Sequence, residues 1–258
     1  MEKLFSIVKN AGKIILDEKD RFDVHKKGDA DFVTKTDIAV QNFIARELSA
    51  LCPDVDFLSE EAPEHEIRGD KYTWVLDPID GTMNFIRGLS ASVISLALLR
   101  GEETELGIVY NPYSDEMFYA RRGEGAFLNG KKISVSKNSS LEDSLIAIGT
   151  APYYKPLVGD CFELYRELFL RGIDIRRTGS AAIDICNVAA GRFDCYYEYM
   201  LSIWDYAAAR LILTEAGGTI TNAEGLATGG ERKSPVIASN GALHKTVLDL
   251  VCKHVYKK

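Results

Sequence analysis

The sequence predicts an α/β protein in which helices and sheets are stacked in layers. Two amphipathic helical patterns come first, a series of short apolar runs of strand type follows, and the second half alternates strand and helix patterns. Alternating patterns of this kind are typical of helices that cover the faces of a sheet. With 258 residues, 46% of them hydrophobic, the chain is long enough to bury a sizeable core.

The first two elements are predicted to be helices with one buried face each. Residues 1–22 carry apolar side chains at helical spacing, separated by charged ones, and the stretch DIAVQNFIARELSALCP repeats this pattern up to Pro53. We expect a polar loop, KKGDADFVTKTD, between them. The first helix lacks the apolar core of a signal peptide, and no run approaches the roughly 20 apolar residues of a membrane span.

The next part of the chain is predicted to form a sheet backed by these two helices. Its apolar or β-rich runs are VDFLSEE, YTWVLDPID, SVISLALLR, ELGIVYNP and EMFYARR. The pair Asn129-Gly130 within AFLNGKKISV predicts a two-residue hairpin turn.

The second half mixes the two kinds of element. Helices are predicted for DCFELYRELFLRG, SAAIDICNVAAGR and WDYAAARLILTEAGG, strands for IDIRRTG, FDCYYEY, TITN and PVIASN, and a last helix from Gly241 onward. We expect one domain, 1–258, with two subdomains of approximately 1–145 and 146–258, because no linker composition marks the soft boundary near 139–151.

Composition excludes several classes of function. The formal charge is −7, the pI is near 5.3 and no basic block is present, which argues against binding to nucleic acid or to an anionic membrane. An anionic substrate would therefore need bound cations. The five cysteines and four histidines are scattered without the close spacing of a zinc or redox site, so we expect reduced thiols and a cytoplasmic protein.

The stretch WVLDPIDGTMNF ends a strand pattern in two carboxylates, Asp77 and Asp80, beside a turn with Pro78 and Gly81. Two adjacent carboxylates repel each other unless they are protonated or bridged by a cation, and hard divalent metals prefer oxygen ligands. In the alternative interpretation, both acids cap the turn and a helix that starts near Gly81.

Three further acids occur at the ends of predicted elements. Glu60 ends the VDFLSEE strand, Asp205 lies at the start of the WDYAAAR helix, and Asp37 completes a capping-box pattern with Thr34. Taken singly, they fit a solvated strand end, an N-cap and a helix cap. Several core elements that all end in acids favour a shared metal site.

These motifs resemble the inositol monophosphatase family of metal-dependent, lithium-sensitive phosphatases. DPIDGTMNF, with SEE upstream and WDYAAARLILTEAGG downstream, matches the family in order and spacing over nearly the whole chain. The resemblance implies an αβαβα sandwich of the inositol monophosphatase and sugar phosphatase type. It also implies two or three Mg²⁺ ions per site and a homodimer.

The resemblance further assigns roles to single residues. It implies that Glu60 and Thr82 orient the attacking water, with Asp37 as an outer partner. The implied metal ligands are four carboxylates and one backbone carbonyl: Glu60, Asp77, Ile79, Asp80 and Asp205. The implied substrate contacts are Asp80, Gly81, Thr82, Gly179, Ser180, Ala181, Glu198 and Asp205.

Two residues depart from the family pattern, since Met200 and Ala209 stand where many members have glycine. Met200 can reshape the pocket for the alcohol. Inositol 1-phosphate is therefore the first expected substrate, and fructose 1,6-bisphosphate, histidinol phosphate and 3'-phosphoadenosine 5'-phosphate remain alternatives. A non-catalytic, metal-binding regulatory protein is the alternative from a different class of function.

Overall fold

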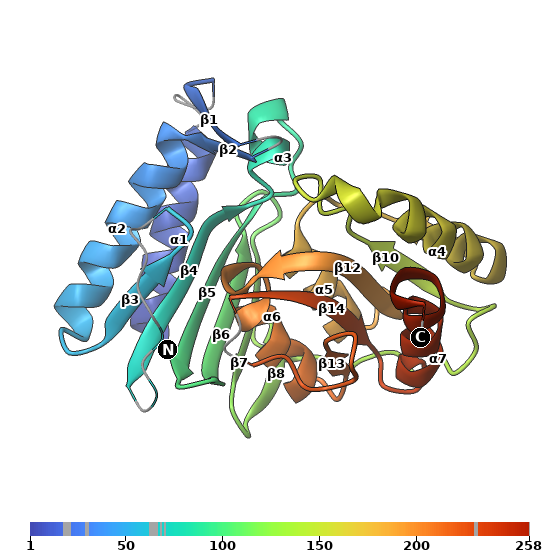
Figure 1. The fold of residues 1–258 in the computed structure, drawn as a ribbon. Coiled ribbons are helices and arrows are strands. Elements are labelled where there is room, and N and C mark those ends of the chain that lie inside the picture. The colour runs from blue at the N-terminus through green and yellow to red at the C-terminus, as the bar shows by residue number, and fades with distance from the viewer. Residues whose placement is uncertain are drawn as a thin grey trace.

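The computed structural model describes residues 1–17, 22–28, 31–61, 67, 69, 71–229 and 232–257. Within these residues the elements form five layers: α1 and α2, a seven-stranded sheet, α5 and α6, a five-stranded sheet, and α4 with α7 (Figure 1). This arrangement confirms the predicted αβαβα sandwich.

The helices are α1 (Glu2–Asp17), α2 (Lys35–Leu51), α3 (Thr82–Arg87), α4 (Val158–Arg171), α5 (Ala181–Ala189), α6 (Ile203–Glu215) and α7 (His244–Val251). The larger sheet has the order β3 (Asp56–Ser59), β4 (Tyr72–Asp80), β5 (Val93–Arg100), β6 (Glu103–Asn111), β7 (Glu116–Arg121), β8 (Gly125–Leu128) and β9 (Lys131–Lys132). The smaller sheet has the order β11 (Asp174–Arg176), β10 (Leu145–Ile148), β12 (Cys195–Ser202), β14 (Lys233–Ser239) and β13 (Thr219–Thr221).

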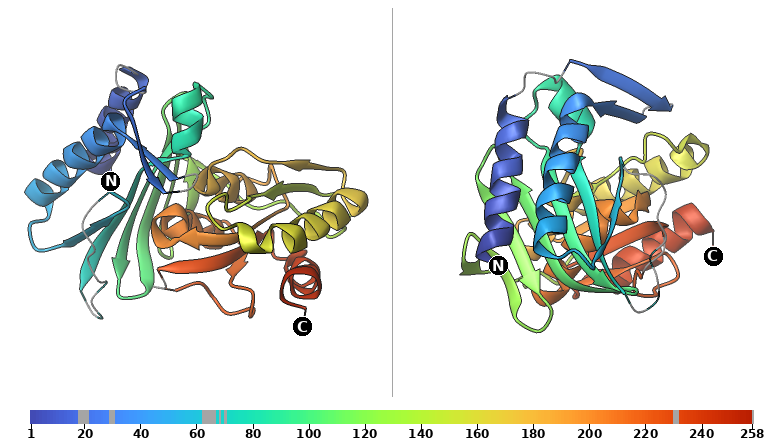
Figure 2. Two further views of the ribbon diagram at one scale, coloured as in Figure 1. Left: turned by 45° about the horizontal axis from the view of Figure 1, so that its top comes forward. Right: turned by 90° about the vertical axis from the view of Figure 1, so that its left-hand side faces the viewer.

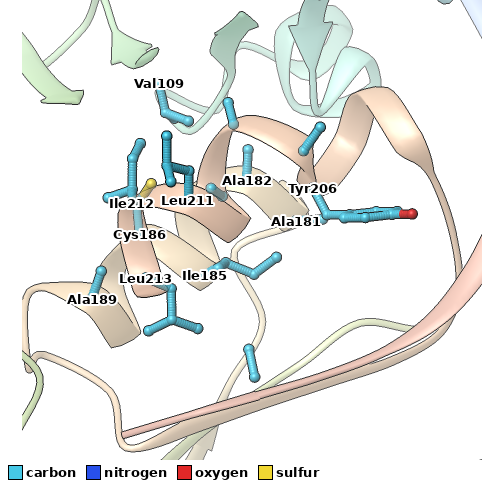
Figure 3. Close-up of a cluster of buried hydrophobic side chains, with 14 of the residues drawn as sticks. Val109, Ala181, Ala182, Ile185, Cys186, Ala189, Tyr206, Leu211, Ile212 and Leu213 are labelled. Carbon is cyan, nitrogen blue, oxygen red and sulfur yellow. The ribbon is translucent and has the colours of Figure 1, made fainter. Parts of the chain in front are cut away.

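Each interface between the layers has its own hydrophobic cluster. One cluster joins α1 and α2 to the outer face of the larger sheet, along which both helices lie (Figure 2). A second cluster fills the space between the sheets around α5 and α6, and Figure 3 shows part of it. A third joins α4 and α7 to the smaller sheet. Burial of these three apolar surfaces is the main force that holds the layers together.

The segment predicted as a polar loop contains a short antiparallel hairpin, β1 (Val24–Gly28) and β2 (Asp31–Thr34). The prediction was wrong here because β1 buries neither face: four of its five residues are exposed, so its sequence lacks the apolar alternation of a strand. Residues 29 and 30 of the predicted loop lie outside the described residues.

Other local predictions are confirmed. Asn129 and Gly130 both have positive φ, at 48° and 79°, and connect the antiparallel strands β8 and β9. The helix expected to end at Gly217-Gly218 ends at Glu215, and Gly217 has a φ of 91°. Among the described residues, no helix has both the length and the apolar character needed to cross a bilayer.

Helix α6 lies unusually close to the larger sheet because both surfaces carry small residues. A Cβ atom on Gly107 of β6 would lie 2.4 Å from the backbone oxygen of Ala208, which is closer than real Cβ contacts allow. Ala207, Ala208 and Ala209 of α6 are all buried at this contact. Ala209, the departure from the family pattern, is therefore part of the core.

We predict that Gly107→Ala lowers the free energy of unfolding by about 1–3 kcal/mol, because the added methyl group must push α6 away from the sheet. Gly159→Ala is the matched control, since a Cβ there would meet nothing within 4 Å and the residue lies in α4, where alanine is the better helix former. Urea unfolding of both variants is the measurement. Equal stabilities of the two variants would contradict the close approach.

Candidate active site

A cleft with a volume of about 660 Å³ opens where the ends of β3 and β4 meet the first turns of α5 and α6. The cleft brings together all the predicted metal and substrate residues, and Asp37, which does not line it, contacts the cleft residue Thr82. Six carboxyl groups line its wall: Glu60, Asp77, Asp80, Asp184, Glu198 and Asp205.

Asp77 and Asp80 lie on either side of a β-bulge. Strand β4 runs to Asp80, the end of the predicted run YTWVLDPID, and its pairing with β5 shifts register between Asp77 and Asp80. A bulge bends the strand and redirects its side chains, which explains how both carboxylates reach one cleft.

The two acids have different hydrogen-bond partners. Asp77 Oδ1 accepts from the N–H of Ile79 at 3.0 Å, as a turn-forming aspartate does. Asp80 Oδ2 accepts from the Ser180 hydroxyl at 2.6 Å and from the Ala182 N–H at 2.7 Å. Asp80 therefore joins the end of β4 to the start of α5, and the interpretation of both acids as caps of the next helix is wrong.

Helix α3 starts at Thr82, next to Gly81 with a φ of 90°. The Thr82 hydroxyl lies 3.1 Å from the carbonyl oxygen of Ile79 and 3.4 Å from Asp37 Oδ1. Asp37 is only 1% exposed and also forms the predicted capping box with Thr34. The Asp37 carboxylate therefore both caps α2 and contacts Thr82 at the site.

Asp205 is the third residue of α6, and its Oδ2 accepts from the Ser202 N–H at 2.7 Å. Glu60 follows β3 on the other side of the cleft. Lys27 of β1 forms ion pairs with Glu60, at 3.5 Å, and with Glu61. Lys27 was not predicted as a site residue, because the hairpin that carries it was not predicted.

The acids of the cleft oppose ionisation in one another. Burial first, and then repulsion from Glu60, Asp80, Asp205 and Asp37, raises the pKa of Asp77 well above its usual value. Burial first, and then repulsion from Asp80, Glu60 and Glu198, raises the pKa of Asp205 well above its usual value.

The pKa of Asp80 is raised less than that of Asp77. Burial raises its pKa to about 6, although the hydrogen bonds from Ser180 and Ala182 act in the opposite direction. A cluster of this kind is stabilised by protons or by cations.

The donor set fits a hard divalent cation, since it offers carboxylate and carbonyl oxygens with several negative charges. In the described part of the chain, no three Asp, Glu, His or Cys side chains already adopt the arrangement of a metal site. The acids instead line a common cleft, in which Glu60, Asp80 and Asp205 lie close enough to Asp77 to raise its pKa.

Glu198 of β12 occupies the other half of the cleft and is 7% exposed. Its Oε1 accepts from the Ala151 N–H at 2.7 Å, and its Oε2 accepts from the Tyr196 hydroxyl. A carboxylate has about four lone-pair sites, so it can accept further hydrogen bonds from a ligand. Gly149 provides the space, because a Cβ there would lie 2.0 Å from Glu198 Oε2.

Several cleft residues were not predicted. Asp184 lies one helical turn beyond Ser180, with a pKa that burial raises to about 8. Tyr153 donates from its hydroxyl to the Met200 carbonyl at 3.2 Å, and Arg177 lines the same wall. For Asp184 the one available signal in the sequence was its i to i+4 spacing from Ser180, which puts both side chains on one face of a helix. Met200 itself lines the cleft, as expected for a residue that shapes the pocket.

Comparison with known proteins agrees with the motifs. A family model described as inositol monophosphatase family matches residues 1–256. A fructose-1,6-bisphosphatase/inositol-1-monophosphatase of Thermotoga maritima is 38% identical over 256 residues, which is 97% of this chain and 96% of the relative. A Nus factor SuhB of Haemophilus influenzae is 38% identical over 216 residues, 82% of this chain and 80% of the relative.

Solved structures have the same fold. An inositol monophosphatase from Thermotoga maritima superposes with a TM-score of 0.89 at 36% identity and covers 100% of this chain and 99% of its own. The chain belongs to the inositol monophosphatase family. Family and relatives together indicate a phosphatase with an α/β sandwich fold.

Proposed function

We propose that this protein hydrolyses phosphate monoesters of small polyols, with inositol 1-phosphate as the first substrate and Mg²⁺ as the cofactor. The observation that carries the proposal is the group of acids at one end of the cleft: the buried Asp77 and Asp80 and the half-buried Asp205, with Glu60 beside them. An anionic ester can approach these charges only when cations neutralise them.

We propose that one ion is held by Glu60, Asp77 and the Ile79 carbonyl, and a second by Asp77, Asp80 and Asp205. A third, mostly hydrated ion would lie near Glu60. Bound magnesium would lower the pKa of a coordinated water and would neutralise charge on the phosphate oxygens. Lithium sensitivity is part of the same proposal.

The protein's own groups orient the reactants. Glu60 accepts a proton from the attacking water and Thr82 holds that water in line with phosphorus, while Asp37 and the Ile79 carbonyl fix the Thr82 hydroxyl. Gly81 and Thr82 line the cleft wall, and their backbone N–H groups would bind phosphate oxygens.

The alcohol part of the substrate would lie towards Glu198 and the segment Gly179–Ala181. The remaining lone pairs of Glu198 suit ring hydroxyls, which favours a polyol over an apolar alcohol. The name of the Thermotoga relative supports fructose 1,6-bisphosphate as a second substrate, and histidinol phosphate remains a third. The name of the SuhB relative supports a regulatory role as the alternative from another class.

The direct test is release of phosphate from inositol 1-phosphate in Mg²⁺ and in excess EDTA. We expect turnover that needs Mg²⁺. The Asp205→Asn variant should lose at least about a hundredfold in turnover, because loss of a metal ligand lowers activity more than loss of an outer-shell partner does. Asp249→Asn, an exposed aspartate on α7, is the matched control and keeps the parent rate.

Turnover that persists in EDTA would refute the metal-dependent mechanism. Near-normal activity of Asp205→Asn at saturating Mg²⁺ would refute its role as a ligand. Complete absence of phosphate release from every ester tested would favour the regulatory alternative.

Glu198→Gln tests the substrate half of the site. Losing one charged hydrogen bond should weaken transition-state binding by about 1–3 kcal/mol. The value of kcat/KM for inositol 1-phosphate should therefore fall roughly five- to 150-fold. p-Nitrophenyl phosphate offers no ring hydroxyls and should lose far less. If both esters lose equally, Glu198 supports the fold or the metal half of the site instead.

A further inference from the structure

Asn84 of the DPIDGTMNF motif connects two segments of the chain that line the cleft. Its side chain is buried, and its Nδ2 donates to the Ala91 carbonyl at 3.0 Å and to the Thr178 carbonyl at 2.9 Å. Ala91 precedes β5 of the larger sheet, whereas Thr178 lies in the loop between β11 and α5 of the other half of the chain. Asn84 is not among the described residues that line the cleft, so it can act on a substrate only through the residues it holds.

Two glycines leave the space that the Asn84 amide occupies. Gly81 and Gly179 have positive φ, at 90° and 87°. A Cβ atom on Gly81 would lie 3.1 Å from Asn84 Nδ2, and one on Gly179 would lie 3.0 Å from Asn84 Oδ1, which is closer than most real Cβ contacts. The amide therefore lies between Gly81, on the proposed phosphate side of the cleft, and Gly179, on the proposed alcohol side.

The loop that carries Gly179 has a second connection to the DPIDGTMNF segment. The Ser180 hydroxyl and the Ala182 N–H both donate to Asp80 at the end of β4. Asp80 is also a proposed metal ligand, so a bound cation would share its carboxylate. The Asn84 amide is uncharged and donates to backbone carbonyls, so its bridge to Thr178 needs no cation.

We propose that Asn84 is a positioning residue that fixes the alcohol side of the cleft relative to its phosphate side. Gly81 and Thr82 would hold the phosphate group, the segment 179–181 would hold the alcohol, and the Asn84 bridge keeps the two segments in register. A substrate that contacts both segments depends on this register, because a small misplacement of bound groups slows the reaction strongly. The inference rests on the proposed phosphatase activity and adds a residue that decides which alcohols are turned over.

The first test compares kcat/KM for inositol 1-phosphate with kcat/KM for p-nitrophenyl phosphate, whose alcohol offers no ring hydroxyls. In Asn84→Ala, the ratio of the two values should fall roughly ten- to a hundredfold, the range for a misplaced binding segment. The value for p-nitrophenyl phosphate should change far less, since the phosphate side keeps its own contacts. A parent-like ratio in Asn84→Ala would overturn the inference.

Asn240→Ala is the matched control. The Asn240 amide is also buried, and its Nδ2 also bridges distant segments, with bonds to the Ser136 hydroxyl at 2.9 Å and to the Asn138 carbonyl at 2.7 Å. Asn240 lies outside the described lining of the cleft, so its removal should destabilise the protein and leave the ratio as in the parent. An equal fall of the ratio in both variants would trace the effect to general loosening and would contradict the proposal.

Hydrogen exchange of the protein in EDTA tests the bridge without catalysis. Asn84→Ala should speed amide exchange in residues 177–182 and leave residues 136–145 as in the parent, and Asn240→Ala should do the reverse. Asn84→Ser, which keeps a shorter donor, should change exchange and ratio in the same direction by less, and it replaces Asn84→Ala if that variant does not fold. Parent-like exchange of residues 177–182 in both Asn84 variants would refute the bridge.

Failure of the two claims can be told apart. Hydrolysis of both esters with a ratio that does not depend on Asn84 refutes only the positioning role. Absence of all hydrolysis in the parent, together with faster exchange of residues 177–182 in Asn84→Ala, refutes the phosphatase proposal and leaves the bridge between the two segments standing.

Discussion

Repulsion among the buried acids of the cleft is the constraint on which the site depends. Asp77, Asp80 and Asp205 are held in place by the backbone and by fixed donors, and burial raises the pKa of each. Carboxylates so placed cost free energy in the metal-free protein. In the proposed function, a cation that binds there would recover this cost and would make the cleft accessible to a phosphate.

The layers of the sandwich supply the rigidity that such a site needs. Asp80 extends from the larger sheet and is bound by Ser180 and Ala182 at the start of α5, about a hundred residues further along the chain. Ser95 of β5 donates to the Trp204 carbonyl at the start of α6, at 3.0 Å. Because α5 and α6 are packed between the sheets (Figure 1), these contacts fix the acids relative to one another.

Much of this arrangement was predictable from the sequence, because apolar runs and periodic patterns report directly on buried strands and helices. The motifs around Asp77, Asp80 and Asp205 predicted that these acids share one site, and the structure places all three on one cleft. The hairpin with Lys27 was missed because both faces of β1 are polar. The bulge between Asp77 and Asp80 depends on the register between β4 and β5, which a local pattern cannot encode.

The most direct measurement is the melting temperature of the parent and of Asp77→Asn as Mg²⁺ is added, with KCl at equal ionic strength as the control. Asp77 is the acid that the proposed ions share, so a ligand that binds the folded state should raise the melting temperature of the parent well beyond the effect of KCl. The account predicts that Asp77→Asn loses most of this Mg²⁺-specific increase, while its melting temperature in EDTA equals or exceeds that of the parent. A parent that responds to Mg²⁺ no more than to KCl, or a variant that responds as the parent does, would contradict the account.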